Sequence, residues 1–378
     1  MPLPSGRFLK GLEPANLGVC NAAGSFLQSG FWGSFKARFG WNARPFIVDW
    51  EGGERPLLVI RRRLLSGFSF AYVPWGPELP GLFSAPGKEG EEARLCALEE
   101  LAVGLRRFLP KDTAFIRFDP PWYSQGTEAS PPMGKPFTRS GADVQPPDTV
   151  LLDLRPSLEK IRGAMKTKTR YNVGLAARKD VKVRCSEFDA PGGVFDADIE
   201  TFYRLLKETA VRDGIAVHGI EYYRTLFSHA REYAAGSSGP RPDVRLYLAE
   251  YLGHYPLAAI GTLFHGPEGV YLYGASSNNG RNLMAPYALQ WKAMEDAKAS
   301  GCTEYDLFGI PPANDENHPM AGLYRFKTGF IGSGEAGGRI IHRPGSWDYT
   351  YRPLAGGLFN TAERLRKKLR SFKKKRPG

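Results

Sequence analysis

The sequence predicts a mixed α/β protein made of two units that repeat the same order of elements. Its 378 residues are more than one hydrophobic core usually holds, which favours two domains. Its composition, 42% hydrophobic and 24% charged residues, is typical of a globular protein. Two halves of the chain show the same succession of strands and helices, and such self-similarity indicates an internal repeat.

The first copy of the repeat begins with three consecutive predicted strands. β-Branched and aromatic runs separated by Gly and charged turns are typical of strands. They occur here as "PFIVDW" (45–50), "RPLLVIRRRLL" (55–65) and "GFSFAYVPWGP" (67–77). A helix is predicted over about 91–108, where Leu and Ala recur at helical spacing. The short strand "AFIRFDP" (114–120) ends this copy.

The second copy repeats this order. Its three strands are "VRLYLAEY" (244–251), "PLAAIGTLF" (256–264) and "GVYLYGASS" (269–277). A helix is predicted from Pro286 to Ala299, where the proline suits the first helical turn. The strand "EYDLFGI" (304–310) follows. Three antiparallel strands followed by helix and strand is the order found in the GCN5-related acyltransferase (GNAT) fold, so we expect a tandem duplication of a GNAT-like α/β (α+β) unit.

The domain boundaries follow from the position of the repeats. We expect the first unit to comprise residues 1–147 plus 323–378, and the second to comprise 148–322. A Pro-rich link, "GKPFTRSGADVQPPD", precedes the strand "TVLLDL" (149–154) that opens the second unit. The stretch "GLYRFKTGF" and the predicted strand "GRIIHRP" lie beyond the second copy, and we expect both to pack back on the first unit.

The formal charge of +12 is unevenly distributed. From Thr361 onward the chain holds nine Lys or Arg and one Glu, a net +8 that leaves +4 for the rest. A second basic cluster, Met165–Arg184, lies on a helical pattern. A basic tail is most often a solvated chain end, and it also suits RNA phosphates or the anionic inner face of a membrane.

Several sites are excluded by spacing. The four cysteines form no CxxC pair, and the six histidines have no metal-ligand spacing, so neither a disulfide framework nor a metal site is predicted. "GSGEAG" fits a dinucleotide motif but opens no helix, and no Walker A or GxSxG motif occurs. No cofactor is therefore expected. Without an apolar leader or spanning segment in the sequence, we expect a cytoplasmic protein.

The stretch "GLYRFKTGF" (322–330) places two cations, Arg325 and Lys327, inside a run of Leu, Tyr and Phe. A stretch of this composition is typical of a buried strand, and burying an ammonium without a partner is costly. Lys327 either extends its stem over apolar surface with its head in water or meets a negative charge brought by a substrate. These nine residues alone do not decide between the two.

Several motifs, in order along nearly the whole chain, resemble those of the Fem family of peptidoglycan-bridge aminoacyltransferases. The residues that carry the resemblance are "FLQSGFWGSFKARFGW", "YVPWGP", "KTKTRYNVGLAARKDVKV", "VRDGI", "VYLYGASS", "EYDLFGIPP" and "HPMAGLYRFKTGFIG". "LYRFKTGF" after "DLFGI" is the most specific of them. Fem proteins are two-unit acyltransferase folds. "SHAREYAAGSSGPRPD" leaves no room for the coiled-coil arm of some members, so the resemblance is to the armless, FemX-like type.

The resemblance implies an activity and its partners. Fem proteins transfer an amino acid from aminoacyl-tRNA to an amino group on the stem peptide of a cell-wall precursor, which is lipid II or UDP-MurNAc-pentapeptide. The donor is already an activated ester, so the protein mainly has to position both substrates and stabilise the oxyanion. We expect a monomer that uses its second unit and basic segments for tRNA, with peripheral membrane contact through the basic tail.

The resemblance also implies the catalytic residues. Lys327 is expected to face the ester carbonyl or the terminal ribose–phosphate of the tRNA, with Phe326 beside it as a stacking wall. Asp119 in "FIRFDPP" follows a predicted strand, where a general base or an ordinary turn residue would lie. An amine nucleophile does not require a strong base, so the role of Asp119 stays open.

Substrate-binding residues are implied in the same way. Arg and Lys bind diphosphates well, and the resemblance points to Lys36 and Arg212 as a diphosphate clamp across a cleft between the units. An ion pair with Asp213 is the structural alternative for Arg212, and a solvated position on an amphipathic helix is that for Lys36. Tyr273 and Arg325 are expected to line the cleft.

Two other functions fit parts of the sequence. An N-acyltransferase that uses acyl-CoA needs a Gly-rich pyrophosphate loop, and "SNNGRNLMAP" supplies a single Gly. A non-enzymatic RNA- or membrane-binding protein would carry its charge throughout the fold, whereas here the excess lies in a tail. Both features favour the aminoacyl-tRNA-dependent transferase.

Overall fold

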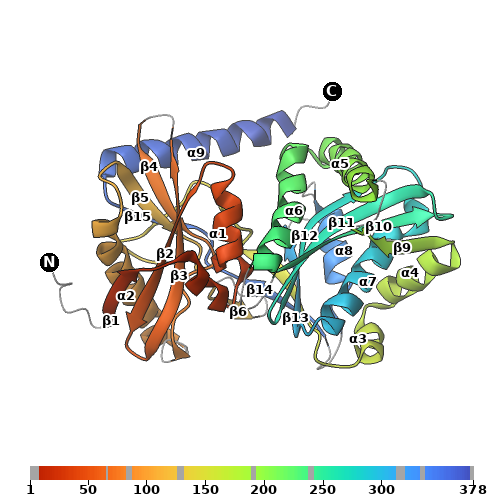
Figure 1. Cartoon of the computed structure of the whole chain (residues 1–378), viewed down its shortest axis with the longest axis horizontal. Helices are drawn as coiled ribbons and strands as arrows, with labels where there is room; N and C mark the ends of the chain where they lie inside the picture. The colour runs from red at the N-terminus through yellow and green to blue at the C-terminus, as the bar shows by residue number, and fades with distance from the viewer. Residues whose placement is uncertain are drawn as a thin grey trace. The chain divides into compact units, whose positions relative to one another are not determined.

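The computed structural model describes most of the chain and divides it into two compact units. The described residues are 8–64, 67–81, 87–125, 132–188, 193–236, 242–311, 320–332 and 337–374. The first unit consists of Met1–Ser124, Glu128–Pro147 and His342–Gly378, and the second of Gln125–Thr127 and Asp148–Ile341. Each unit is built around its own sheet (Figure 1).

The sheet of the first unit has seven strands in the order β1-β2-β3-β4-β5-β15-β7. Their bounds are Leu9–Pro14 (β1), Asn42–Trp50 (β2), Gly53–Arg63 (β3), Ser69–Val73 (β4), Thr113–Phe118 (β5), Trp347–Thr350 (β15) and Thr138–Arg139 (β7). Each successive pair from β1 to β4 is antiparallel, β5 is parallel to β4, and β15 is antiparallel to both β5 and β7. The three predicted strands and the later one of the first copy are confirmed.

Helices cover this sheet. Their bounds are Gly30–Ala37 (α1), Gly87–Leu105 (α2) and Pro353–Lys374 (α9), with 3₁₀ turns at Leu17–Ala22, Phe26–Gln28 and Arg106–Phe108. The apolar run of β3 shows why both faces are covered. Leu57 and Val59 belong to one core cluster, which includes residues of α2. Leu58 and Ile60 belong to a second cluster, against which Phe359 of α9 packs. A strand buried on both faces reads as a continuous apolar run, as "LLVI" does.

The sheet of the second unit has eight strands in the order β6-β14-β8-β13-β12-β11-β10-β9. Their bounds are Ser124–Gln125 (β6), Arg339–His342 (β14), Asp148–Asp153 (β8), Glu304–Gly309 (β13), Glu268–Ser276 (β12), Tyr255–His265 (β11), Asp243–Tyr251 (β10) and Val181–Cys185 (β9). Strands β9 to β12 are antiparallel, and β13 is parallel to β12. The order predicted for the second copy is confirmed.

The helices of the second unit also lie on both faces of its sheet. Their bounds are Leu158–Ala164 (α3), Thr167–Arg178 (α4), Val194–Asp213 (α5), Ile220–Gly236 (α6), Ala285–Ala299 (α7) and Ala321–Thr328 (α8), with a 3₁₀ turn at Arg281–Leu283. α4 and α7 share one core cluster with the sheet, through Val173 and Leu289 among others. α5 packs along β12, and α6 along β10.

The course of the chain after the second copy differs from the expectation. "GLYRFKTGF" forms helix α8 instead of a strand, and Phe330 belongs to the core cluster of the second unit. β14, within the predicted strand "GRIIHRP", lies beside β8 in the second sheet. Only β15 and α9 return to the first unit, so the boundary falls after Ile341 and not after residue 322. Hydrogen bonds to β13 and packing on α7 hold α8 in the second unit.

Candidate active site

The parallel pair β12–β13 of the second unit separates after a short paired stretch. β12 pairs with β13 over Glu268–Val270 only, while its later residues pair with β11 as far as Ser276. In the first unit the equivalent pair β4–β5 stays together along the whole of Ser69–Val73. The second half of β12 therefore has an unpaired edge towards β13, and this edge leaves room for a side chain between the strands.

Lys327 of α8 lies at this separation. Its Nζ donates to the Gly309 carbonyl at 2.8 Å and to the Phe308 carbonyl at 3.3 Å, at the end of β13. The same Nζ lies 5.1 Å from the centre of the Tyr271 ring, one residue beyond the last paired position of β12. Lys327 is only 4% exposed. The ammonium thus bridges the two strands where they part, through two carbonyl dipoles and an aromatic face.

The backbone of β13 is shaped to present those carbonyls. Phe308 has a φ of 59°, in the left-handed region that non-glycine residues rarely occupy. The pairing of β13 with β8 shifts between Asp306 and Gly309, as at a β-bulge. The Asp306 carboxylate accepts from the Phe308 N–H at 2.7 Å and from the Thr149 hydroxyl. Local strain of this kind is a feature of functional sites, and Asp306 holds it in place.

The surroundings of Lys327 change its titration. Burial lowers the pKa of Lys327 to about 7, because removing an ammonium from water disfavours its charged form, and the nearby Asp306 carboxylate acts in the opposite direction. Two of the three ammonium N–H donors go to the carbonyls of β13. Among the described residues, the structure gives no hydrogen-bond acceptor for the third. Lys327 is suited to donate a hydrogen bond, or a proton, to an oxygen that becomes negative during the reaction.

Tyr271 connects Lys327 to the end of α5. Burial raises the pKa of Tyr271, and the Asp213 carboxylate adds to the shift, so the C-terminal end of α5 lies near this tyrosine. The hydroxyl of Tyr271 lies against the backbone of Gly274, where any Cβ would collide with it. Gly274 is therefore a position of close approach between side chain and strand.

Arg212, in the last turn of α5, is fully engaged within the second unit. It donates to the Ser276 carbonyl and Asn278 Oδ1, both at 2.9 Å, and to the Ser276 hydroxyl at 3.1 Å. It also donates to Asp213 at 3.1 Å and to the Thr209 hydroxyl at 3.4 Å. All five guanidinium donors have partners. Arg212 ties α5 to the end of β12, and as a diphosphate ligand, which stays a prediction, it would have to exchange some of these bonds.

The other predicted site residues of the second unit are two packed aromatic side chains and one exposed arginine. The Phe326 ring packs edge-on against Tyr287 of α7 at 4.9 Å and against Phe330 at 5.4 Å, so it contributes to the core under α8. Tyr273 packs against Tyr223 of α6 at 5.0 Å. Arg325 is exposed and forms no ion pair with any residue that the structure describes. Their contacts with substrate stay predictions.

Lys36 lies in the first unit, in the last turn of α1. Its Nζ is 5.5 Å from the centre of the Trp32 ring and 5.6 Å from that of Trp41, whose ring is also 5.4 Å from the Arg62 guanidinium. Burial lowers the pKa of Lys36 to about 8, and the charge of Arg62 lowers it further. Two cations and two indoles thus gather within this unit, an arrangement suited to an anion with a flat ring. Its role in the predicted clamp is untested.

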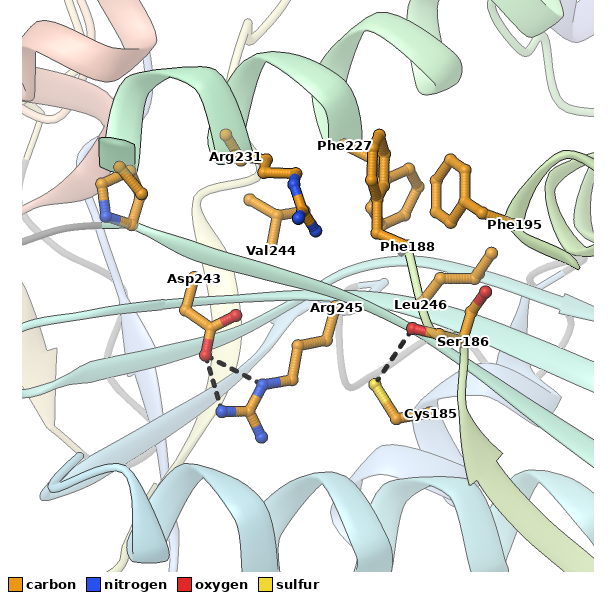
Figure 2. Close-up of a pocket in the computed structure, with 13 residues that line it drawn as sticks. Cys185, Ser186, Phe188, Phe195, Phe227, Arg231, Asp243, Val244, Arg245 and Leu246 are labelled. Atoms are coloured by element: carbon orange, nitrogen blue, oxygen red, sulfur yellow. Dashed lines mark hydrogen bonds and ion pairs between the residues drawn. The ribbon is translucent and has the colours of Figure 1, made fainter. Parts of the chain in front are cut away.

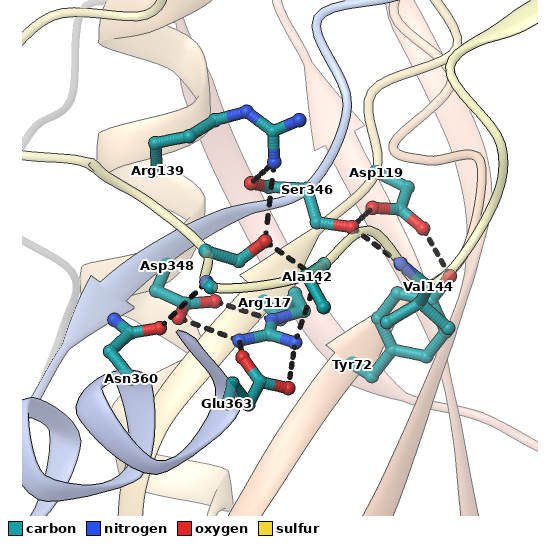
Figure 3. Close-up of polar contacts among 12 residues, drawn as sticks. Tyr72, Arg117, Asp119, Arg139, Ala142, Val144, Ser346, Asp348, Asn360 and Glu363 are labelled. Atoms are coloured by element: carbon teal, nitrogen blue, oxygen red, sulfur yellow. Dashed lines mark hydrogen bonds and ion pairs between the residues drawn. The ribbon is translucent and has the colours of Figure 1, made fainter. Parts of the chain in front are cut away.

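Asp119 is a buried acceptor in the first unit (Figure 3). One carboxylate oxygen accepts from the Tyr72 hydroxyl and from the Gln145 N–H at 3.2 Å, and the other accepts from the Ser346 hydroxyl. Burial raises the pKa of Asp119 to about 6, although the hydrogen bonds from Ser346 and Tyr72 lower it. These bonds join β4 and β5 to the segments before β8 and β15, so the visible role of Asp119 is structural.

The structure brings together residues that sequence reasoning did not single out. Tyr271 and Asp306 surround Lys327, and the strained Phe308 presents a carbonyl to it. Two signals were present: an acidic residue interrupts the apolar strand "EYDLFG", and Tyr271 precedes Tyr273 in "VYLYG". The strain at Phe308 has no sequence signal, because Phe is an unusual residue at positive φ.

A separate pocket of about 390 Å³ lies between α6 and the edge of the second sheet (Figure 2). Phe188, Phe195 and Phe227 form one side of it, and Arg231 and Arg245 lie at its border. None of the predicted site residues lines it. The pocket is therefore distinct from the site around Lys327.

The residues that the structure describes offer neither a metal site nor a membrane-spanning helix. Within those residues, no group of three or more His, Cys, Asp or Glu side chains is arranged to hold a metal ion. Within the same part of the chain, no helix combines the length and apolar character needed to cross a bilayer. His318 and most of "GSGEAG" lie outside the described residues.

Known proteins share this architecture over nearly its whole length. The chain is similar to a crystal structure of FemX, with a TM-score of 0.67 at 18% identity, covering 93% of this chain and 100% of that one. It is 20% identical to a lipid II:glycine glycyltransferase of Staphylococcus aureus (strain MRSA252), with 93% of this chain and 94% of the relative covered. The enzyme of the same name from strain USA300 is also 20% identical, with 93% of each chain covered.

The duplicated GNAT-like fold and the named activity of these relatives define the class of the protein, an aminoacyltransferase. The model of one family matches residues 134–234 and 244–364, more than half of the chain. The chain belongs to the FemAB family. This confirms the resemblance drawn from the motifs around "LYRFKTGF".

Proposed function

We propose that this protein transfers an amino acid from aminoacyl-tRNA to the side-chain amine of a peptidoglycan precursor, in the cytoplasm, and so builds the interpeptide bridge. The observation that carries the proposal is Lys327, a buried lysine with a lowered pKa at the parted strands β12 and β13. A buried, perturbed lysine beside a strained backbone is a feature of catalytic sites. Membership of the FemAB family and the names of the relatives support the acceptor class.

The chemical step needs one well-placed donor. The acceptor amine attacks the ester carbonyl carbon, a tetrahedral oxyanion forms, and the bond to the ribose oxygen breaks as the amide is completed. The proton lost by the amine ends on the ribose oxygen. The Lys327 ammonium donates to the oxyanion or to the departing oxygen, and its low pKa makes it a better proton donor than an ordinary lysine.

The donor side of the proposal rests on the surface of α4. Exposed basic residues lie on α4 and just beyond it: Lys166, Lys168, Arg178, Lys179 and Lys182. The exposed Tyr171 ring lies among them, 5.4 Å from the Arg178 guanidinium. The N–H of Lys166 donates to the Gly329 carbonyl at 3.1 Å, so this surface begins two residues from Lys327. Lys and Arg around an aromatic ring suit an RNA strand near its reactive end.

The acceptor side of the proposal rests on Lys36 of the first unit and Arg212 of the second, each as a ligand for phosphate. The cluster of cations and indoles around Lys36 supports the binding of a phosphate. Arg212 donates to Asp213, whose carboxylate is close enough to Tyr271 to raise the pKa of that tyrosine. We also propose that the protein acts as a monomer and attaches peripherally to the inner face of the membrane.

The test is a transfer assay with purified protein, charged tRNA pools and either lipid II or UDP-MurNAc-pentapeptide, with the product weighed by mass spectrometry. We expect a mass gain of one or more amino acids, which disappears after RNase treatment and which acetyl-CoA neither supports nor inhibits. Product formed from acyl-CoA in the absence of tRNA would overturn the proposal.

Reversing the charge of basic residues on α4 tests whether this helix binds the tRNA. Lys168→Glu with Arg178→Glu should weaken aminoacyl-tRNA binding and reduce its dependence on salt, because each phosphate contact contributes about 0.7–0.9 log unit per tenfold change in salt. Lys88→Glu, an exposed lysine on α2, is the matched control. An equal effect of the control, or none of the double variant, places the RNA elsewhere.

A further inference from the structure

Helix α9 carries apolar side chains on the face that points away from the first unit. Leu354 is 87% exposed, Leu358 74% and Leu365 56%. Their spacings of four and seven residues place all three on one side of the helix. Exposed leucines in a row are unusual on a protein surface and indicate an interaction.

The opposite face of α9 fixes this orientation (Figure 3). Glu363 accepts two hydrogen bonds from the Arg117 guanidinium, at 2.8 and 2.9 Å, and Asn360 accepts from the Gly141 N–H at 3.1 Å. The Phe359 ring lies 5.2 Å from that of Phe115 on β5. Arg117 is 1% exposed and also pairs with Asp348 of β15. Because this face is anchored, the helix cannot rotate to bury its leucines in the unit that carries it.

Charge identifies the partner. The chain from Thr361 onward holds nine Lys or Arg, and its one acid, Glu363, is engaged with Arg117. A helix with leucines on one face and many Lys or Arg in its sequence is the kind that lies in the interface of a bilayer with anionic lipids. RNA would be bound by the charges alone and gives no reason for exposed leucines.

We propose that α9 docks the protein on an anionic membrane surface, with Leu354, Leu358 and Leu365 inserted at the headgroup boundary. The first unit lies on the far side of α9 from the lipid. Attachment uses two signals, apolar insertion and electrostatic attraction, neither of which suffices alone. This docking rests on the peripheral membrane attachment proposed above and gives it a structural basis. It is separate from the transferase reaction, because its assays contain neither donor nor acceptor.

The first experiment is co-flotation of the full-length protein with vesicles of phosphatidylcholine, with or without phosphatidylglycerol. We expect binding to the anionic vesicles only, weakening as salt rises. The triple variant L354Q/L358Q/L365Q should bind at least about tenfold more weakly, since each buried leucine contributes to partitioning. Val103→Gln, an exposed apolar residue on α2 with 45% exposure, is the matched control and should bind normally.

The second variant adds to the face. Thr361 is exposed, lies between Leu358 and Leu365 in the sequence, and should share their side of the helix. Thr361→Leu should raise vesicle affinity without affecting RNA affinity. The proposal would be overturned if the Val103→Gln control lost as much vesicle binding as the triple variant. It would also be overturned if Thr361→Leu bound vesicles no better than the wild type. A triple variant that binds vesicles normally, or loses only RNA binding, would overturn it as well.

Discussion

Replacement of Lys327 by Met tests the central residue of the candidate site in two independent ways. Met keeps the apolar stem and removes the charge and the N–H donors that contact β13. If Lys327 donates to the developing oxyanion, single-turnover transfer should slow by about 10²–10³, or roughly 2.7–4 kcal/mol, the usual effect of removing one such donor. Substrate binding should change much less.

The same replacement has a consequence for stability that depends on pH. The pKa of Lys327 is about 7 in the folded protein, below the value of 10.5 for a lysine in water. The unfolded chain therefore binds more protons between these values, and the stability of the wild type rises with pH in this window. The full cost of burying the charge is present below about pH 7 and fades above it. Met does not titrate. Raising the pH from 7 to 9 should therefore increase the free energy of unfolding of the wild type, relative to that of Lys327→Met, by roughly 2–3 kcal/mol.

The measurements are rapid-quench transfer with preformed aminoacyl-tRNA, and urea unfolding at pH 7 and pH 9. Lys298→Met is the matched control, because Lys298 Nζ also donates to two carbonyls, those of Leu154 at 2.6 Å and Arg155 at 3.2 Å. It should leave the chemical step unchanged. Near-native turnover of Lys327→Met would refute the catalytic role. A stability difference independent of pH would refute the burial argument even if turnover falls.

Three further predictions concern the binding residues, the buried network and the tail. Lys36→Ala and Arg212→Ala should each weaken precursor binding measured by calorimetry and spare aminoacyl-tRNA affinity; unchanged precursor affinity in both would place the clamp elsewhere. Arg117→Met leaves the carboxylates of Asp348 and Glu363 unpaired and should lower the free energy of unfolding measured in urea by about 3–5 kcal/mol. Asp119→Asn should retain saturated turnover if that carboxylate is only structural. Truncation after Leu369 should flatten the salt dependence of vesicle or tRNA binding with turnover near normal, and a large fall in turnover would contradict this.

The elements of the two copies were predictable because their signals are local. Runs such as "LLVI" and "VRLYLAEY" combine β-branched and aromatic residues between turns, and a helix follows each set of strands at the expected place. α7 begins at Ala285, one residue before the proline that predicted its first turn. Here local propensity and tertiary structure agree.

The stretch from Gly322 to Phe330 shows where local reasoning fails. Its aromatic residues suggested a strand, yet it forms α8, because Tyr324 and Phe326 pack on the core of the second unit while Lys327 reaches β13. That choice is made by residues distant in sequence. The site around Lys327 was equally beyond prediction in detail, since the separation of β12 from β13 and the strain at Phe308 arise from pairing geometry.

The position of β15 in the first sheet bears on how the chain matures. β15 lies between β5 and β7, inside the sheet and not at its border, and comes from residues 347–350. Synthesis must therefore have passed residue 350 before the first unit can close its sheet, although that unit also contains β1 to β5. Until then β5 has an unpaired flank, exposed to wrong partners. The second unit consists of the short segment Gln125–Thr127 and the continuous stretch Asp148–Ile341, so it would finish folding first.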